Sequence, residues 1–298
     1  MSTLYNQITT NKTKSFALMV IVVAVVLGIV AFYSYSMRGD FSLPIIAAIL
    51  AVPSSLIGYF AGDKIALASN GAKELPDAAA PDLHNLVENL AITAGIPKPK
   101  LYIIQSPALN AFATGRDPEH ASIAVTTGLI EHLERSELEG VLAHELSHVK
   151  NYDILYGTLV AIFVGFVVML SDLFMRATWF GGGLRSRDDS GRNQAGGILA
   201  IVGLVLLIVS PIIVQLIQLA VSRQREYLAD SSGALLTRYP EGLARALEKI
   251  SGSSPLQSAG HATAHLYIAN PFRARSIAHL FATHPPIEER IKRLRRAA

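Results

Sequence analysis

Four long stretches without a charged residue dominate the hydrophobic pattern of this chain. They lie between Lys14 and Arg38, between Asp40 and Asp63, between Asp153 and Asp172, and between Arg192 and Arg223. A helix needs about 20 apolar residues to cross a bilayer, so three of the stretches are long enough and the third just reaches the threshold. The pattern predicts four hydrophobic helices that span a membrane. Buried core helices are the alternative, and the last two helices could also form a hairpin partly shielded by protein.

Positive charges near the first stretch predict its orientation. Lys12 and Lys14 precede it, whereas only Arg38 follows it in the next loop, so the N-terminus is expected in the cytoplasm. The apolar run is too long for a signal peptide, which favours an uncleaved anchor. The loop from Arg176 to Arg192 holds four arginines and is expected outside, so the topology of the second hairpin stays open.

The polar regions between these stretches predict a soluble domain made of two parts. Residues 81–96 repeat apolar positions at helical spacing and end at Gly95 and Pro97. Three short strands are expected at residues 100–106, 109–115 and 120–127, because these segments are rich in β-branched and aromatic residues. A further helix is expected at residues 241–250. The predicted organisation is an anchor at 1–62, two parts of one soluble domain at 63–153 and 223–298, and a hydrophobic hairpin at 154–222 with a polar loop at 176–195.

One predicted helix carries candidate chemistry. Ser136 and Glu139 have the form of a capping box, which places a helix start at about Ser136. The helix then runs through the segment HELSH. His144 and His148 are four residues apart and project from one face, so they can occupy two corners of a tetrahedral zinc site. Glu145 can take a proton from a water molecule and pass it to a leaving amine. A chance match on a surface helix is the alternative.

Composition narrows the remaining choices. The chain has 298 residues, 51% of them hydrophobic, with a mean hydropathy of +0.37, which is typical of a membrane protein. It has no cysteine, so a disulfide framework or a thiolate metal site is excluded. The net charge of +3 is accompanied by no nucleic-acid-binding motif. Any metal must be bound by histidine and carboxylate groups.

A catalytic zinc needs a third protein ligand, and Glu226 is our choice. It lies in the segment REYLAD, and Asp230 follows on the same helical face, where it can accept a hydrogen bond from a ligating imidazole. A solvated helix with Glu226 facing water is the alternative. His261 and His265 are also four apart, but they lack a glutamate directly after the first and are interpreted as incidental.

These motifs together resemble a known family. HELSH, REYLAD, the NAFATG segment before AVTTGLI, and HPPIEER near the C-terminus are similar to the HtpX-type membrane zinc metalloproteases, over nearly the whole chain. The CAAX prenyl-protein proteases are more distant relatives. The resemblance implies an α+β membrane protein with a mainly helical zincin-like domain, a small β-sheet and four hydrophobic helices.

The resemblance also implies roles for individual residues. It implies a gluzincin with one Zn²⁺ per chain on His144, His148 and Glu226, and with Glu145 as general base and acid. Asp230 matches the carboxylate that orients a zinc-bound histidine. His284 and Arg290 match positions near the active site, where His284 would stabilise the oxyanion. Asn110, Ile123 and Val125 match an edge that holds the substrate backbone in extended form. For His284 and Asn110, simple turn chemistry is the alternative.

The expected function is proteolysis at a membrane. The chain is interpreted as a multi-pass metalloendopeptidase of a bacterial inner membrane, with its protease domain in the cytoplasm. Its expected partners are the lipid bilayer and damaged or unfolded membrane proteins, which it would degrade in quality control and stress response. Nucleic acid is not an expected partner. A processing peptidase for lipidated substrates and a zinc-binding scaffold without catalysis are the alternatives.

Overall fold

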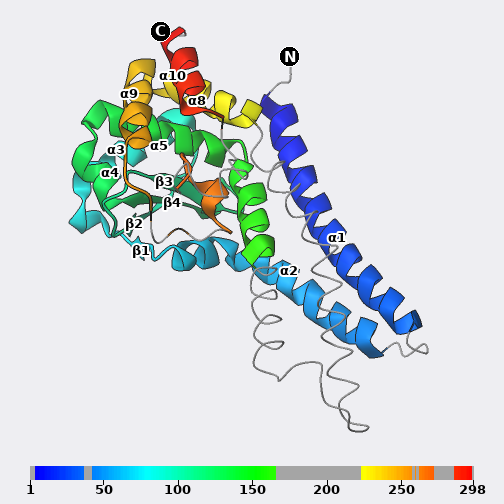
Figure 1. Cartoon of the computed structure of the whole chain (residues 1–298). Helices are drawn as coiled ribbons and strands as arrows, with labels where there is room; N and C mark the ends of the chain where they lie inside the picture. The colour runs from blue at the N-terminus through cyan, green and yellow to red at the C-terminus, as the bar shows by residue number, and fades with distance from the viewer. Residues whose placement is uncertain are drawn as a thin grey trace.

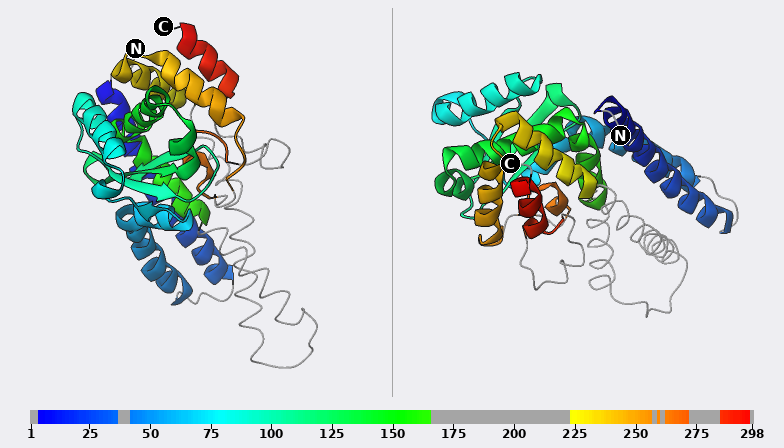
Figure 2. Two further views of the ribbon diagram at one scale, coloured as in Figure 1. Left: turned by 90° about the vertical axis from the view of Figure 1, so that its left-hand side faces the viewer. Right: turned by 90° about the horizontal axis from the view of Figure 1, so that it is seen from above.

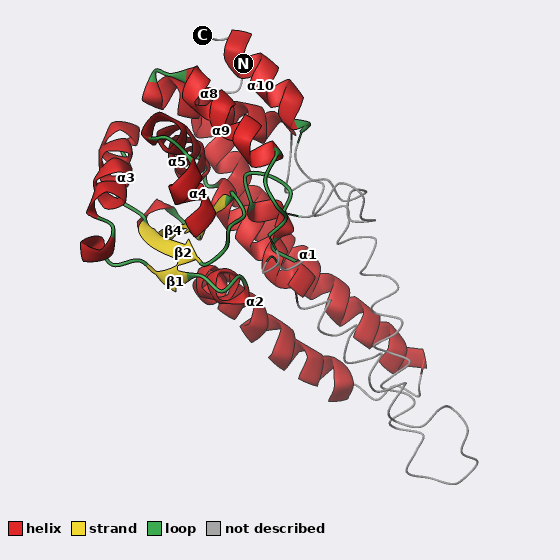
Figure 3. Cartoon of the chain, turned by 60° about the vertical axis from the view of Figure 1, so that its left-hand side comes forward, coloured by secondary structure: helices red, strands yellow, loops and turns green. Residues whose placement is uncertain are grey.

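The computed structural model describes residues 4–36, 42–165, 223–256, 259, 262–271 and 285–296. Most of the predicted third and fourth hydrophobic helices, and His284, lie outside these residues. The described part is mainly helical with one small mixed sheet, as predicted (Figures 1 and 3). Its labelled α-helices are α1 (Leu4–Ser36), α2 (Ser42–Ser69), α3 (Pro81–Ala94), α4 (Thr127–His132), α5 (Arg135–Lys150), α8 (Arg223–Thr237), α9 (Pro240–Ser251) and α10 (Ile287–Arg296).

Helices α1 and α2 contain the first two predicted hydrophobic segments. They lie side by side, and the C-terminal half of α1 and the N-terminal half of α2 extend away from the remaining labelled elements (Figures 1 and 2). Along the described residues, no helix meets the combined length and apolarity needed to cross a bilayer. The N-terminal half of α1 packs on a helical stretch at residues 153–165, where Leu18 meets Leu155 and Leu159 in an apolar cluster.

The sheet has four strands in the order β1-β2-β4-β3. The strands are β1 (Lys73–Glu74), β2 (Lys100–Ile104), β3 (Ala111–Gly115) and β4 (Ala121–Thr126). Strands β2 and β4 are parallel, and both β1 and β3 pair antiparallel with their neighbours. The three predicted strands are therefore confirmed.

The expected substrate edge at Ile123 and Val125 is wrong. Both residues lie in β4, which is hydrogen-bonded to β2 on one side and to β3 on the other. Their side chains are fully buried. β4 lies between β2 and β3, so the outer strands are β1 and, on the side next to β4, β3. Sequence periodicity predicts that a strand forms, but not which strands flank it.

Helix α5 begins slightly earlier than predicted. Its N-cap is Glu134, whose N–H donates to the Glu137 carboxylate at 2.8 Å. The predicted cap formed by Ser136 and Glu139 is wrong, because Ser136 already lies inside the first turn. Glu137 also pairs with Lys249 of α9 at 2.6 Å, which explains why this carboxylate is buried. The prediction that α3 ends at Gly95 is confirmed by the left-handed φ of 72° at that residue.

The main core surrounds α5. Buried apolar residues of α5 join those of α3, the sheet, α8 and α9 in one cluster. Two glycines allow close helix contacts: a Cβ at Gly140 would lie 2.6 Å from the Leu243 nitrogen, and one at Gly233 would lie 3.0 Å from the His144 nitrogen. These contacts bring α8 and α9 against the helix that carries HELSH.

Candidate metal centre

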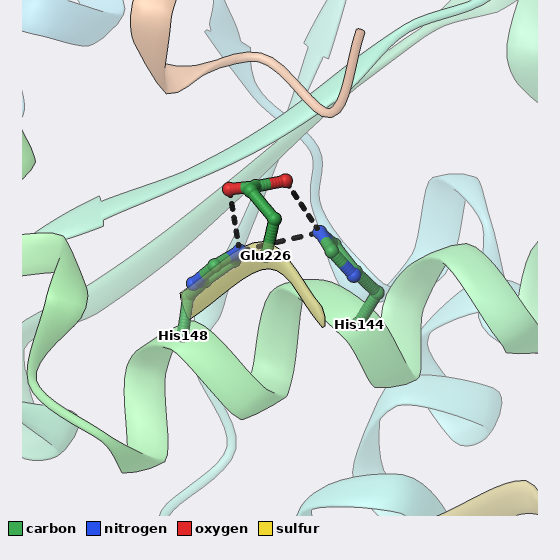
Figure 4. Close-up of side chains that lie close together, drawn as sticks. All are labelled: His144, His148 and Glu226. Carbon is green, nitrogen blue, oxygen red and sulfur yellow. Dashed lines mark hydrogen bonds and ion pairs between the residues drawn. The ribbon is translucent and has the colours of Figure 1, made fainter. Parts of the chain in front are cut away.

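His144 and His148 lie one turn apart on α5 and direct their rings toward the same point (Figure 4). Their Nε2 atoms are 3.2 Å apart. His144 is completely buried, and the side chain of His148 is 14% exposed. The helical spacing in the sequence therefore produces the expected pair of converging imidazoles.

Glu226 approaches the two rings from α8, on the opposite side of the point where they converge (Figure 4). Its Oε1 is 3.6 Å from His148 Nε2, and its Oε2 is 3.9 Å from His144 Nε2. One ligand atom from each of the three residues lies within 4.8 Å of the others. The close approach depends on Gly233, two turns further along α8, because a side chain there would meet the backbone of His144.

A carboxylate holds the other ring nitrogen of each histidine. Asp230 Oδ1 is 2.9 Å from His144 Nδ1, as the sequence predicted. Asp153 Oδ2 is 3.1 Å from His148 Nδ1. When each Nδ1–H donates to a carboxylate, each Nε2 presents its lone pair to the centre. Asp153 was not among the residues predicted from the sequence, although an acidic residue three positions after the end of α5 is visible there.

Arg290 of α10 supports this arrangement from behind. Its Nε and one terminal nitrogen donate to both oxygens of Asp230, at 2.9 and 2.7 Å, and its other terminal nitrogen donates to the Ile268 carbonyl at 2.8 Å. The same nitrogen lies 3.6 Å from Glu226. Burial would raise the pKa of Asp230, but the Arg290 charge and the hydrogen bonds outweigh it and lower the pKa to about 2. Asp230 is therefore ionised at neutral pH.

The two histidines differ in their electrostatic surroundings. Burial, together with the neighbouring Arg290, lowers the pKa of His144 to about 4. Burial also acts to lower the pKa of His148, but the hydrogen bond to Asp153 and the negative charge of Glu226 raise it to about 9. A metal ligand must be a neutral ring, so metal binding at this centre releases a proton.

Glu145 is buried directly beside the converging rings, with 1% of its surface exposed. Burial raises its pKa to about 7, although the N–H of Ala113 on β3 donates to it. Its Oε1 has no hydrogen-bond partner among the described residues. A carboxylate with a pKa near neutral and an unused oxygen is suited to accept and return a proton.

The donor set fits a zinc ion. Two Nε2 lone pairs at 3.2 Å repel each other unless a proton or a metal cation lies between them. Metal bonds of about 2.0–2.1 Å in a tetrahedron place neighbouring ligand atoms about 3.3–3.4 Å apart. His148 Nε2 lies 3.2 Å from His144 Nε2 and 3.6 Å from Glu226 Oε1, and both distances are close to that spacing. Two imidazoles and a carboxylate, without cysteine, are a typical catalytic zinc set.

A small pocket of about 40 Å³ opens beside this centre. Its lining residues include Glu145, His148, Glu226, Ala113 and His265. His265 is buried, and its Nε2 is 3.0 Å from the Gly157 carbonyl. His265 was interpreted as incidental from the sequence, because its spacing from His261 gives no sign that it lies at the pocket.

Asn110 lies just before β3 and is buried among backbone groups. Its amide nitrogen donates to the Ala269 carbonyl at 3.0 Å, and its carbonyl oxygen accepts from the N–H of Ala111 at 3.1 Å. The Ile268 N–H in turn donates to the Ala111 carbonyl at 2.9 Å. Asn110 therefore fixes the start of the outer strand and the segment beside it.

Comparison with known proteins agrees with this geometry. Residues 77–298 match Peptidase family M48. The chain belongs to peptidase family M48. A "Protease HtpX homolog" from Caldanaerobacter subterraneus subsp. tengcongensis is 48% identical over 98% of this chain and 97% of its own length. A protein with the same description from Thermoanaerobacter pseudethanolicus has the same identity and coverage.

The M48 peptidase also resembles a solved structure, the crystal structure of S. mikatae Ste24p. The TM-score is 0.52 at 20% identity, and the match covers 97% of this chain and 67% of the other. At this identity the likeness shows a shared fold alone. Family membership and the buried histidine and carboxylate cluster make the chain a zinc metalloprotease, a hydrolase of peptide bonds.

Proposed function

We propose that this M48 peptidase is an endopeptidase with one zinc ion per chain, held by His144, His148 and Glu226. The observation that carries the proposal is the convergence of both Nε2 atoms and the Glu226 carboxylate, while the opposite ring nitrogens are hydrogen-bonded to Asp230 and Asp153. Zinc bound there would supply Lewis acidity, which polarises a carbonyl and makes water nucleophilic near neutral pH.

Glu145 would move the protons of the reaction. Its raised pKa lets it accept a proton from water as the water attacks the scissile carbonyl. The protonated Glu145 can then donate to the departing amine nitrogen. Burial makes this transfer efficient, because bulk water does not compete for the proton.

Asp230 and Arg290 would hold the metal ligands in place without touching substrate. Asp230 fixes His144, and Arg290 fixes Asp230 through two parallel hydrogen bonds. His284 lies outside the described residues, so its proposed action on the oxyanion rests on the HPPIEER motif alone.

For substrate backbone we propose the outer strand β3. Its Ala113 N–H donates to Glu145, so β3 passes directly beside the proposed general base. The 267–268 segment already pairs with Ala111 and Phe112 on this edge, so an extended peptide would lie beside β3 from Ala113 onward, with its scissile bond close to Glu145. Asn110 would act indirectly, because its side chain fixes the strand and the 267–269 segment.

We also propose that α1 and α2, together with the hydrophobic segments within residues 154–222, lie in a bacterial inner membrane. Large apolar side chains are exposed along both described helices, including Phe16 at 66%, Ile57 at 56% and Phe60 at 58%. Such a surface is typical of contact with lipid. The distribution of lysine and arginine favours a protease domain in the cytoplasm. Substrates would then be damaged or unfolded membrane proteins, with their cytoplasmic loops nearest the site.

Replacing Glu145 by glutamine tests the chemical part of this proposal. Glu145→Gln keeps the size of the side chain but cannot accept a proton, so kcat should fall by about 100-fold to 10,000-fold while zinc stays bound. Peptide cleavage and metal content of the purified, detergent-solubilised protein measure both effects. Glu226→Ala should instead lose zinc. Undiminished cleavage by Glu145→Gln, or full zinc content in Glu226→Ala, would contradict the assigned roles.

A further inference from the structure

The N-terminal part of α1 docks on the turn that follows the metal-binding helix. Asn11 is 5% exposed there, and its amide nitrogen donates to the Asn151 carbonyl and to Asp153 Oδ1, both at 2.8 Å. Next to it, the Lys12 ammonium lies 4.1 Å from the ring centre of Tyr152. Helix α1 therefore contacts each of the three residues that follow Lys150.

Asp153 joins these contacts to the metal centre through its two oxygens. Oδ2 faces Nδ1 of His148 at 3.1 Å. Oδ1 accepts from Asn11 and lies 3.5 Å from an Arg225 nitrogen, at the end of α8 that carries Glu226. A carboxylate held at one oxygen cannot rotate freely, so the other oxygen stays aligned with the imidazole.

Of the two groups that contact Asp153 Oδ1, Asn11 lies closer than Arg225. The 3.5 Å separation from Arg225 is at the outer limit of a hydrogen bond, whereas the 2.8 Å bond from Asn11 is short. Burying an amide costs free energy unless its hydrogen bonds are made, and both described bonds of the Asn11 side-chain amide end in this turn.

We propose that Asn11 is a positioning residue for the metal centre: through Asp153 it fixes the orientation of His148, so that docking of α1 and zinc binding reinforce each other. This inference rests on the proposed zinc site. By reciprocity, zinc should strengthen the docking of α1 by the same factor by which docking strengthens zinc binding.

A double-mutant cycle on the full-length protein in detergent tests the proposal. Zinc affinity would be measured by chelator competition for the wild type, Asn11→Ala, Asp153→Ala and the double variant. Removing a carboxylate behind a ligand typically lowers metal affinity roughly 10-fold to 100-fold, so Asp153→Ala should show that loss and Asn11→Ala a smaller one of roughly threefold to tenfold. Thr13→Ala, at an exposed position on the same helix, is the matched control and should bind zinc normally.

The cycle separates the possible outcomes. If Asn11 acts through Asp153, its replacement should have no further effect in the Asp153→Ala background. Unchanged affinity in Asn11→Ala, or an equal loss in both backgrounds, would overturn the proposal. Asn11→Asp, which keeps the side-chain size but sets two carboxylates against each other, should lower the affinity more than alanine does. Failure of the wild type to bind zinc would refute the proposed function, whereas an inert Asn11→Ala would refute only this inference.

Hydrogen exchange gives a second readout that does not depend on activity. Adding zinc should slow amide exchange in residues 8–15 of the wild-type protein, because ligand binding and helix docking are coupled. The zinc-dependent protection should disappear in Asn11→Ala and persist in Thr13→Ala. Equal protection in both variants would also overturn the proposal.

Discussion

At the scale of single residues, the two histidines are held in similar ways by different parts of the chain. Asp230, on α8, accepts from His144, and Asp153, directly after α5, accepts from His148. Each carboxylate also faces a guanidinium: Arg290 lies 2.7 Å from Asp230, and Arg225 lies 3.5 Å from Asp153, which Asn11 holds more closely. The bond from Arg290 is shorter and fully buried, so the His144 side is expected to be the more rigid.

Arg290→Lys tests how much the paired hydrogen bonds from Arg290 to Asp230 contribute to stability. Lysine keeps the charge but cannot form two parallel bonds to Asp230 and a third to Ile268. We expect the free energy of unfolding to fall by about 2–4 kcal/mol, because a buried ion pair is disrupted. Denaturant unfolding in detergent measures it. Arg296→Lys makes the same change at an exposed position of α10 and should stay within about 0.5 kcal/mol. Equal stability of both variants would contradict the role given to Arg290.

At the scale of elements, the contact between α5 and α8 decides whether the site forms. The two histidines need only one helix, but Glu226 and Asp230 reach them because α8 packs close to α5 at Gly233. The sequence predicted both helices and predicted that Glu226 of α8 would join the two histidines of α5. It did not predict the start of α5 correctly, because several acidic residues near Ser136 are possible caps and the choice depends on Lys249 of α9.

Gly233→Ala tests this contact. In an ordinary helix, alanine in place of glycine stabilises by about 0.5–1 kcal/mol. Here the new Cβ would lie 3.0–3.3 Å from the backbone of Ala143 and His144. We therefore expect α8 to shift, zinc affinity to fall by about tenfold, and the protein to lose about 1–3 kcal/mol of stability.

The control for this change is Gly252→Ala at the end of α9. A Cβ there would meet its nearest neighbour, the Lys249 carbonyl, at 3.7 Å, which is ordinary contact. Its zinc affinity should equal that of the wild type. If Gly233→Ala binds zinc as tightly as Gly252→Ala does, close packing at Gly233 is not required for the site.

At the scale of the whole molecule, the metal centre joins parts of the chain that are distant in sequence. His144 and His148 lie in α5, Glu226 and Asp230 lie in α8, and Asn11, which contacts Asp153, lies in α1. A cation bound at the centre would therefore stabilise the whole assembly and not only its own ligands.

Zinc removal should consequently lower global stability. A ligand present at about 1,000 times its Kd contributes about 4 kcal/mol, so chelation should lower the melting temperature by several degrees. Differential scanning calorimetry before and after chelation, with zinc added back, provides the measurement. Glu226→Ala should already melt at the lower temperature and respond little to the chelator. A wild type that is insensitive to chelation would argue against zinc as a structural link between the two parts.

The proposed membrane location predicts a preference among substrates. Helices α1 and α2 expose apolar side chains, so membrane-anchored substrates should be concentrated beside the site. We expect an unfolded segment to be cleaved faster when it is attached to a transmembrane helix than when it is soluble, with both in the same detergent or lipid vesicles. Equal rates for the two substrates would argue against membrane proteins as the preferred class.

The sequence by itself determined what depends on local geometry. A helical repeat of 3.6 residues places His144 and His148 on one face and predicts α3 from its apolar spacing, and β-branched and aromatic residues predict the strands. Zinc chemistry pointed to Glu145 and to the need for a third ligand, and the family resemblance favoured Glu226 over a solvated glutamate. Tertiary structure alone decided which strand is outermost, that Asp153 and not a second α8 residue supports His148, and that Asn11 reaches the site. These facts depend on packing between distant segments, which spacing along the chain does not encode.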